Sequence, residues 1–293
     1  MDKNVTIAVD NLITQFDDLQ YVTDLSLATS LYLLKQLRKP LLIEGEAGVG
    51  KTETAKILAS HLQTDLIRLQ CYEGLDIDSA VYEWNYQRQL LAIKMQENRD
   101  STIEEKEKMI FSEKYLLERP LLKSIKYTDK PPVLLIDEID RADIEFEALL
   151  LELLSDFQIS IPELGTIKAQ QIPYVILTSN RTRELSDALK RRCLYHWIDY
   201  PDYDKELKII LKKFPNIKIE LAKQVVKIIQ HLRTTKLKKI PGIAETLDWV
   251  DSLLELKVNT LDGTTIEQTL GSILKSVEDI KSVKSGEISI STE

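Results

Sequence analysis

The sequence has few of the residues on which disulfide-bonded, metal-clustered and turn-rich proteins depend. Its 293 residues include two cysteines, nine glycines, nine prolines and 6% aromatic residues. Because Cys71 and Cys193 stand far apart, a disulfide framework and a cysteine-based metal site are both disfavoured, and reduced thiols in the cytoplasm are expected. The scarcity of glycine and proline excludes collagen-like and low-complexity chains and disfavours most all-β folds.

Long apolar runs are also missing. The chain starts Met1-Asp2-Lys3-Asn4, without a basic stretch followed by an apolar one, so no signal peptide is predicted. The longest wholly apolar runs are short and end in acids, and none approaches the roughly 18 residues that cross a bilayer. We therefore expect a cytoplasmic protein with no stable membrane insertion.

Positive charge is in deficit. The chain has 39 Lys and Arg against 47 Asp and Glu, a net charge of −8, so the overall basic footprint of a nucleic-acid binder is missing. Its 43% hydrophobic and 29% charged residues are typical of a globular chain. The length fits two domains at about 150 residues each.

Short apolar runs separated by helical patterns predict a parallel α/β sheet. Four runs have the length and composition of buried strands: 41–43, 66–69, 133–136 and 174–177. Residues 146–154 then place apolar side chains at helical spacing, and residues 158–168 alternate, turn and return, which predicts a hairpin. Residues 94–114 are dense in charge and predict a solvated helix outside the sheet.

The pattern changes near Tyr200-Pro201. Beyond this point three apolar stripes predict helices, within residues 221–232, 243–254 and 270–277. We therefore divide the chain into an α/β domain of residues 1–200, a helical domain of residues 201–280 and a polar tail of residues 281–293 that we expect to be disordered.

A glycine-rich turn between the first predicted strand and a helix fits the P-loop pattern G-x-x-x-x-G-K-S/T. It consists of Gly45, Glu46, Ala47, Gly48, Val49, Gly50, Lys51 and Thr52. The glycines let backbone N–H groups turn toward phosphates, and the positive end of the next helix adds to the attraction. Lys51 then reaches the β- and γ-phosphates and the Thr52 hydroxyl binds Mg²⁺, so the motif predicts ATP and Mg²⁺ as cofactors. An ordinary glycine-rich turn is the alternative, which the flanking strand and helix disfavour.

An acidic pair, Asp137-Glu138, ends the predicted strand 133–136. Open α/β sheets bind ligands at the carboxyl ends of their strands. There Asp137 would hold Mg²⁺ through a coordinated water, and Glu138 would polarise the water that attacks the γ-phosphate. The alternative is a pair of solvated carboxylates, which the P-loop upstream disfavours.

Two later segments supply further polar groups. Asn180 follows the strand 174–177 and would orient the attacking water beside Glu138, although asparagine at a strand end is also a common turn residue. Arg191 and Arg192 stand in a basic cluster. This cluster either complements the negative end of a helix or offers an arginine finger to the nucleotide of a neighbouring subunit.

These elements, in this order, resemble an AAA+ ATPase over nearly the whole chain and, within that superfamily, the MoxR group. The resemblance implies a P-loop NTPase αβα sandwich with a parallel sheet, followed by a small all-α lid domain. The segment of about 74–130 resembles the family's insert in the preceding helix, and residues 158–168 resemble its pre-sensor hairpin. Residues 180–185, 191–195 and 242–249 are similar to the branch that accompanies carbon monoxide dehydrogenase genes.

The resemblance also implies a role for each motif residue. Residues 45–52 match Walker A, Asp137 and Glu138 match Walker B, Asn180 matches sensor 1, and Arg192, with Arg191 as the second candidate, matches the arginine finger. One departure concerns the lid. Residues 241–245 read Pro-Gly-Ile-Ala-Glu where the family has a basic sensor 2, so no sensor 2 is assigned.

As a whole, the resemblance implies an enzyme that hydrolyses ATP to ADP and phosphate while it remodels or assembles a protein client. It further implies a homo-oligomer, usually a hexameric ring, a partner with a von Willebrand factor A domain, and maturation of a metal-cofactor enzyme. The alternating aromatics Tyr82, Trp84 and Tyr86 either pack the insert, which we favour, or contact the client.

Two alternatives stay open. The first is an AAA+ nucleic-acid motor, which the net charge of −8 disfavours; Lys236–Lys239 is the one short basic run of note. We therefore expect no nucleic acid as partner. The second is a nucleotide-binding scaffold with little turnover, a reading that nothing in the sequence demands because Glu138, Asn180 and Arg192 are all present.

Overall fold

The computed structural model describes residues 2–95 and 102–288. They form two compact units. The first, called the sheet unit here, comprises residues 29–44 and 54–196, and the second, the helical unit, comprises the residues before 29, residues 45–53 and the residues from 197 onward. The sequence-based division at residue 200 stays a prediction, since this grouping places the P-loop and the N-terminal helix with the C-terminal helices.

A five-stranded sheet in the order β2-β5-β8-β1-β9 forms the centre of the sheet unit. Its strands are β1 (Leu41–Gly45), β2 (Leu66–Gln70), β5 (Val133–Asp137), β8 (Tyr174–Ser179) and β9 (Leu194–Ile198). The pairs β1–β8, β2–β5 and β5–β8 are parallel, so the carboxyl ends of these four strands share one edge. The four predicted strands are confirmed; β9 was not predicted.

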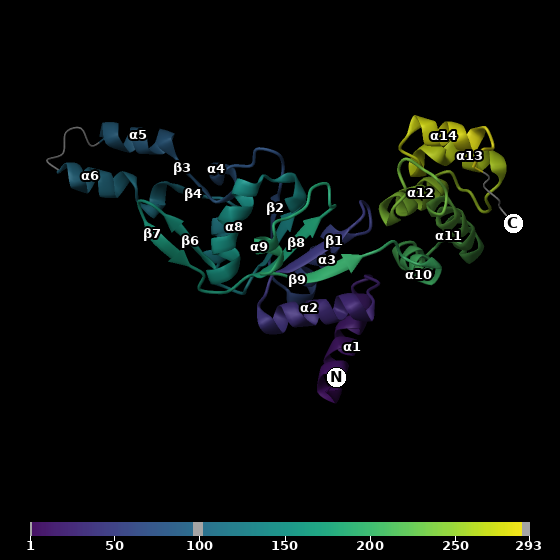
Figure 1. Cartoon of the computed structure of the whole chain (residues 1–293), viewed down its shortest axis with the longest axis horizontal. Helices are drawn as coiled ribbons and strands as arrows, with labels where there is room; N and C mark the ends of the chain where they lie inside the picture. The colour runs from purple at the N-terminus through teal and green to yellow at the C-terminus, as the bar shows by residue number, and fades with distance from the viewer. Residues whose placement is uncertain (1, 96–101, 289–293) are drawn as a thin grey trace. The chain divides into compact units, whose positions relative to one another are not determined.

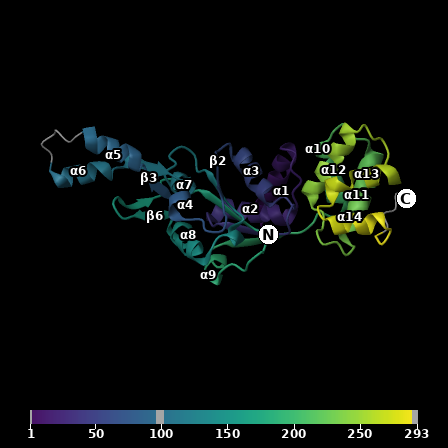
Figure 2. The ribbon, with the colours of Figure 1, turned by 90° about the horizontal axis from the view of Figure 1, so that it is seen from above.

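Helices flank both faces of this sheet because parallel crossovers are right-handed. The crossover through α3 (Lys51–Leu62) runs from β1 to β2, whereas those through α7 (Pro120–Ile125) and α8 (Ile144–Asp156) return from β2 to β5 and from β5 to β8. The opposite directions place α3 on one face and α7 and α8 on the other. Two further helices, α2 (Leu25–Leu37) and α9 (Asp187–Lys190), are labelled in Figures 1 and 2.

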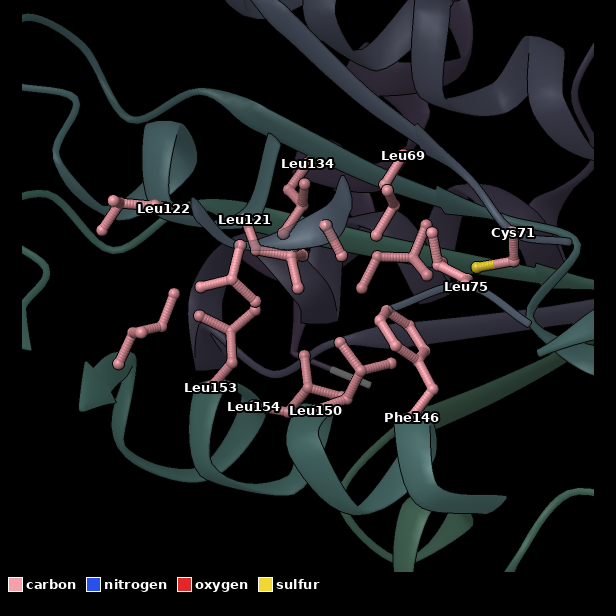
Figure 3. Close-up of a cluster of buried hydrophobic side chains, with 14 of the residues drawn as sticks. Leu69, Cys71, Leu75, Leu121, Leu122, Leu134, Phe146, Leu150, Leu153 and Leu154 are labelled. Atoms are coloured by element: carbon pink, nitrogen blue, oxygen red, sulfur yellow. The ribbon is translucent and has the colours of Figure 1, made fainter. Parts of the chain in front are cut away.

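The apolar stripe predicted within residues 146–154 lies on α8 and faces the sheet. Figure 3 shows Phe146, Leu150, Leu153 and Leu154 pointing toward Leu69 and Leu134 of the strands, with Leu121 of α7 between them. All of these side chains are buried. The predicted αβα sandwich of the P-loop NTPase class, with a parallel sheet and a helical C-terminal region, is therefore confirmed.

The segment of about 74–130, which the sequence analysis describes as an insert, is built of short helices and strands, and its role as an insert stays a prediction. It contains α4 (Ile77–Ala80), β3 (Tyr82–Trp84), α5 (Tyr86–Met95), α6 (Ile103–Ile110), η1 (Glu113–Tyr115) and β4 (Leu116–Glu118) before α7. Buried residues from both its ends and its middle, among them Leu75, Trp84, Leu116 and Ile125, belong to the main core cluster. Of the predicted charged helix over 94–114, the structure has α6, while residues 96–101 lie outside the described residues.

The aromatic residues of this segment divide between packing and exposure. Trp84 is buried against Phe111, with their rings 5.4 Å apart and edge to face, and Tyr82 packs edge-on to Trp84. Gln89 joins α5 to α6 by donating to the Ile110 carbonyl (2.6 Å). Packing is therefore confirmed for Tyr82 and Trp84, whereas Tyr86 is 63% exposed.

The predicted hairpin within residues 158–168 is confirmed. It consists of β6 (Gln158–Ile161) and β7 (Gly165–Lys168), which pair antiparallel. Within the described part of the chain, no helix combines the length and the apolar character that a membrane span requires.

Five C-terminal helices form the core of the helical unit. They are α10 (Tyr203–Lys213), α11 (Ile219–Arg233), α12 (Ile243–Glu255), α13 (Gly263–Ile273) and α14 (Val277–Lys284), and Figure 2 shows them gathered into one bundle. Trp249 is fully buried there and donates its indole N–H to Thr269 (2.8 Å). The first two predicted stripes are confirmed on α11 and α12.

Two expectations for the C-terminus are corrected. The stripe predicted within residues 270–277 is interrupted, because α13 ends at Ile273 and Val277 starts a new helix with 65% exposure. The tail expected from Lys281 begins too early, since α14 continues to Lys284; residues 289–293 lie outside the described residues.

An N-terminal helix that the sequence analysis missed also belongs to the helical unit. Helix α1 (Lys3–Asp18) buries Val9, Leu12 and Phe16. Near its end, Asp17 forms ion pairs with Lys208 (2.9 Å) and Lys212 (2.7 Å) of α10. The hydrogen bonds from these two lysines, Lys212 first, lower the pKa of Asp17.

Candidate functional site

The P-loop begins where β1 ends. Gly45 closes the strand, and α3 starts at Lys51. Gly48 and Gly50 have φ values of +77° and +96°, a region that glycine enters without the strain of a side chain. These two residues therefore explain why a tight turn is possible between a buried strand and a helix.

Lys51 is held by the loop that precedes it. Its side chain is only 7% exposed, and its ammonium donates to the carbonyls of Gly45 (2.7 Å) and Glu46 (2.6 Å). The charge of Lys51 is thus fixed at the centre of the turn, where the backbone N–H groups of a P-loop bind phosphate.

The start of α12 lies against the same loop. The Ala244 N–H donates to the Gly48 carbonyl (3.2 Å), and the Glu245 carboxylate caps the Gly242 N–H (3.0 Å). This is the stretch that lacks the family's basic sensor 2. At the start of α12, where the resemblance would place the basic sensor 2, the structure has a glycine and a glutamate beside the P-loop.

Buried ion pairing fixes the stretch before α12 as well. Glu206 is fully buried and pairs with both terminal nitrogens of Arg233 at 2.7 Å. Arg233 also donates to the Pro241 carbonyl (2.9 Å), one residue before Gly242. These hydrogen bonds satisfy both charges and hold the chain that leads into α12.

Asp137 ends β5 and is almost completely buried. Thr178 donates its hydroxyl to one carboxylate oxygen (2.5 Å), and Arg68 pairs with the other (2.6 Å). Arg68 comes from β2, the neighbouring strand. Carboxylate oxygens are hard donors of the kind that Mg²⁺ prefers, although Mg²⁺ at this oxygen would have to replace the Arg68 contact.

Glu138 follows in the left-handed conformation, with φ 55° and ψ 50°. Its backbone N–H donates to the Thr178 hydroxyl (2.9 Å), and its half-buried carboxylate accepts from Gln70 (3.0 Å) and forms an ion pair with Arg141 (3.3 Å). A non-glycine residue in this conformation is strained and persists only where its surroundings hold it. Gln70, Arg141 and Thr178, which lie on three segments, hold Glu138 in place. Its carboxylate is the group to which the sequence analysis assigns water activation.

Asn180 lies beside Glu138, as the order of motifs predicts. Its side-chain amide nitrogen is 3.4 Å from the second Glu138 oxygen. The carboxylate and the amide come from the ends of two adjacent parallel strands, β5 and β8. The structure therefore brings Asp137, Glu138 and Asn180 together at one edge of the sheet unit.

The two arginine candidates follow α9. Arg192 donates to the Ser155 hydroxyl (2.6 Å) at the end of α8 and to the Ala188 carbonyl (2.9 Å). Arg191 is exposed and is the C-terminal cap residue of α9. Because α9 has four residues, the helix-dipole explanation for this cluster is weak, and the arginine-finger explanation stays a prediction.

Two partners of the acidic pair, Arg68 and Gln70, escaped the sequence analysis. They alternate with apolar residues in Leu66-Ile67-Arg68-Leu69-Gln70, which places both on one face of a strand that pairs with β5. Two polar residues at this spacing in an otherwise buried strand were the signal that could have indicated them.

Titratable groups around this edge have perturbed pKa values. Burial first, and then the charges of Asp137, Asp140 and Glu138, raises the pKa of the Cys71 thiol to about 12. Burial and the hydrogen bond to Glu44 (3.0 Å) raise the pKa of the Tyr195 hydroxyl. Both shifts favour the neutral form of the group.

Relatives of known sequence cover most of the chain. An uncharacterized protein of Staphylococcus haemolyticus is 27% identical over 270 residues, which span 89% of this chain and 93% of the relative. An uncharacterized protein of Staphylococcus epidermidis is 29% identical over 231 residues, which span 76% of this chain and 78% of the relative.

Two solved structures are similar to this chain, and the one with the higher TM-score supports the fold. A point mutant of Thermotoga maritima RuvB matches 90% of this chain and 72% of its own, with 21% identity and a TM-score of 0.51. The Thermotoga maritima RuvB Holliday junction branch migration motor matches 92% of this chain and 69% of its own, with 19% identity and a TM-score of 0.46. At this level of identity the likeness concerns the fold alone.

A family model assigns the α/β part directly. Residues 40–193 match the AAA domain of the dynein-related subfamily, and this range covers the P-loop, the acidic pair, Asn180 and both candidate arginines. The chain belongs to this AAA family, the dynein-related subfamily of the AAA+ ATPases.

Proposed function

We propose that the chain hydrolyses ATP to ADP and phosphate with Glu138 as the general base. The observation that carries this proposal is the 3.4 Å contact between the Asn180 amide and the Glu138 carboxylate at the shared carboxyl edge of β5 and β8. An amide donor beside a carboxylate is able to orient the water that the carboxylate polarises. The P-loop residues 45–52 bind the phosphates through backbone N–H groups and the Lys51 ammonium.

Asp137 and Thr52 are the residues that would hold Mg²⁺. Both offer hard oxygen atoms, the ligands that Mg²⁺ prefers. Bound with the nucleotide, Mg²⁺ supplies neutralisation of the charge on the β- and γ-phosphates. The chain's own residues orient the water, accept its proton at Glu138 and hold the phosphates.

The proposal includes a ring of identical subunits, six by the MoxR resemblance, in which Arg192 serves the nucleotide of the next subunit. An arginine has the planar, permanently charged group that stabilises charge developing on a transferred phosphoryl group. Arg191, one residue earlier and exposed, is the second candidate for this role. Residues of the P-loop and of the acidic pair would then act from one subunit, and the finger from its neighbour.

The work proposed for this cycle is MoxR-type remodelling or assembly of a protein client in the cytoplasm, together with a partner that carries a von Willebrand factor A domain. Two surface features support a protein client. Helix α5 exposes Leu90, Leu91 and Met95 by 58% or more, and exposed apolar patches mark interaction sites. A hollow of about 370 Å³ is lined by Leu75, Asp76, Ile77, Asp78, Glu145, Phe146 and Leu149.

The charge of this hollow disfavours nucleic acid. Three of its seven lining residues are acids and none is basic, and the whole chain has a net charge of −8. Phosphate backbones require basic surfaces.

Maturation of a metal-cofactor enzyme is a part of the proposal that rests on the resemblance alone.

The test measures phosphate release by the purified chain alone, with a candidate partner that carries a von Willebrand factor A domain and comes from the same organism, and with single-stranded DNA. We expect slow basal turnover that changes with the protein partner, because differential binding to one state of the ring shifts the cycle. DNA should have little effect. The Glu138→Gln variant, measured in every arm, supplies the background.

Two outcomes would contradict the proposal. Stimulation by DNA that weakens with salt, without a response to the protein, would instead support a nucleic-acid motor. Turnover equal to that of Glu138→Gln in every arm, with ATP still bound, would support a nucleotide-binding scaffold.

A further inference from the structure

Asp140 is a buried carboxyl group that the proposed reaction does not use. It lies in η2 (Ile139–Arg141), the short turn after the acidic pair, and its side chain is 3% exposed. One oxygen accepts the Asn180 N–H (3.1 Å), and the other accepts the Thr182 N–H (2.9 Å) and the Thr182 hydroxyl (2.7 Å). All three donors belong to the loop that follows β8.

The residue between these two amides is strained. Arg181 has a φ of 58°, the left-handed region that residues with a side chain rarely adopt, and its N–H donates to the Ser179 hydroxyl (3.0 Å). Such a conformation persists only where neighbouring groups hold it. Two flanking N–H groups that converge on one buried carboxylate provide that restraint.

The same loop carries the Asn180 amide. Its backbone is fixed on Asp140, while its side chain reaches Glu138, two residues before Asp140 in sequence. Glu138 is itself left-handed, with a φ of 55°. The turn after β5 and the loop after β8 are thus joined at Asp140 and at Glu138, and Arg183 also donates to the Ala142 carbonyl (2.5 Å).

We propose that Asp140 is a positioning residue for ATP hydrolysis: it sets the left-handed turn at Arg181 and thereby holds the Asn180 amide at Glu138. The inference rests on the proposed function, because it names what places the amide that orients the water. It assigns Asp140 no contact with the nucleotide and no proton transfer.

The first experiment compares Asp140→Asn with Asp143→Asn. The asparagine at 140 keeps the size but turns an NH₂ group toward backbone N–H donors, so the loop shifts. We expect kcat to fall about tenfold, since small displacements of a positioning group reduce rates strongly. The dissociation constant for ATP should stay within about twofold, because the proposal assigns Asp140 no contact with the nucleotide.

Asp143 is the matched control. It is exposed, it precedes α8, and its side chain makes no capping hydrogen bond. The same chemical change there should leave kcat at the parent value. An equal fall in kcat for both variants would overturn the proposal, as would parent-like kcat in Asp140→Asn.

A double-mutant cycle separates positioning from mere structural support. If Asp140 acts through Asn180, then Asp140→Asn should change kcat by less than about twofold once Asn180→Ala is already present. A purely structural role predicts that the full loss persists in the Asn180→Ala background. Persistence of the full loss would therefore sink the assignment.

Two further measurements keep the test decisive. Thr182→Val removes one hydrogen-bond donor from an exposed side chain, so the variant should fold and show a smaller fall in kcat. If Asp140→Asn does not fold, an unchanged kcat in Thr182→Val refutes the proposal.

Hydrogen exchange at the Asn180 and Thr182 amides measures the restraint on the loop without any turnover. Faster exchange in Asp140→Asn supports the restraint, even if the parent chain proves unable to hydrolyse ATP, and unchanged exchange refutes it.

Discussion

Gly242 and Gly48 touch backbone to backbone. A Cβ atom added to Gly242 would lie 2.9 Å from the Cα and the carbonyl carbon of Gly48, and 2.9 Å from the Ala47 carbonyl oxygen. The φ of Gly242 is −84°, which any residue can adopt, so it is the close approach to the P-loop that requires glycine here. The helix that carries no sensor 2 arginine is therefore in direct contact with the phosphate-binding loop.

We predict that Gly242→Ala weakens ATP binding. Overpacking against rigid backbone costs about 1–3 kcal/mol, so the dissociation constant should rise roughly tenfold when the α12 contact shifts. Titration with a fluorescent ATP analogue measures this. Gly271→Ala is the control, since nothing lies within 4 Å of a Cβ there and the residue is inside α13. Equal affinities for the two variants would show that the contact does not matter for binding.

Lys51→Ala and Glu138→Gln should separate binding from turnover. Lys51→Ala should lose most nucleotide affinity, because the loop is left without the cation that now contacts the Gly45 and Glu46 carbonyls. Glu138→Gln should bind ATP and hydrolyse it at least tenfold more slowly, a lower bound that lies below the about 10²–10⁴ attributed to general acid–base groups. Equilibrium binding and phosphate release distinguish the two effects. Parent-like turnover in Glu138→Gln would remove Glu138 from the mechanism.

Mixing two inactive variants tests whether Arg192 acts on a neighbouring subunit. Arg192→Ala should bind ATP but hydrolyse it poorly, and Lys51→Ala should be inactive. When the two are reassembled in equal amounts, about a quarter of the interfaces in a random heterologous ring pair an intact P-loop with an intact finger. Phosphate release should therefore recover in part.

The control for this rescue is the double variant mixed with either single variant, because no interface is then complete. Mixed rings that form without any gain in turnover would exclude Arg192 as a finger acting in trans. Arg191 would then be the next residue to substitute.

The two cysteines should react slowly in the folded chain. Burial raises the pKa of both Cys71 and Cys193 to about 12, and both are free thiols. At about pH 8 the native thiolate fraction is reduced roughly thousandfold relative to an ordinary cysteine, so alkylation should be at least about a hundredfold slower than after unfolding. Labelling of Cys71→Ser and Cys193→Ser assigns each rate, and a thiol that reacts at its unfolded rate contradicts this prediction.

The same shifts give a dependence of stability on pH. A raised pKa means that the folded state favours the neutral thiol, so this contribution to stability is complete below the ordinary thiol pKa of 9.0 and is lost as the pH rises toward 12. Denaturant unfolding across this range should show stability falling with pH. The two serine variants should show a smaller fall.

Local patterns were sufficient for the sheet and the P-loop. Runs such as Val133–Ile136 are apolar at every position because a central parallel strand is buried on both faces. The P-loop is contiguous, and its chemistry requires glycine and lysine at fixed spacing, so eight residues in sequence contain the whole signal. The proximity of Asp137, Glu138 and Asn180 was also predictable, because the carboxyl ends of parallel strands share one edge of the sheet.

The partners that site residues find on distant segments were identified only from the tertiary structure. Arg68 and Gln70 contact the acidic pair because β2 lies next to β5. The apolar periodicity of a strand does not predict which strand lies beside it. Asp140 finds the loop after β8 for the same reason. A side chain's own sequence neighbourhood determines its element and the face on which it lies; which group it meets there is decided only when the strands and helices pack together.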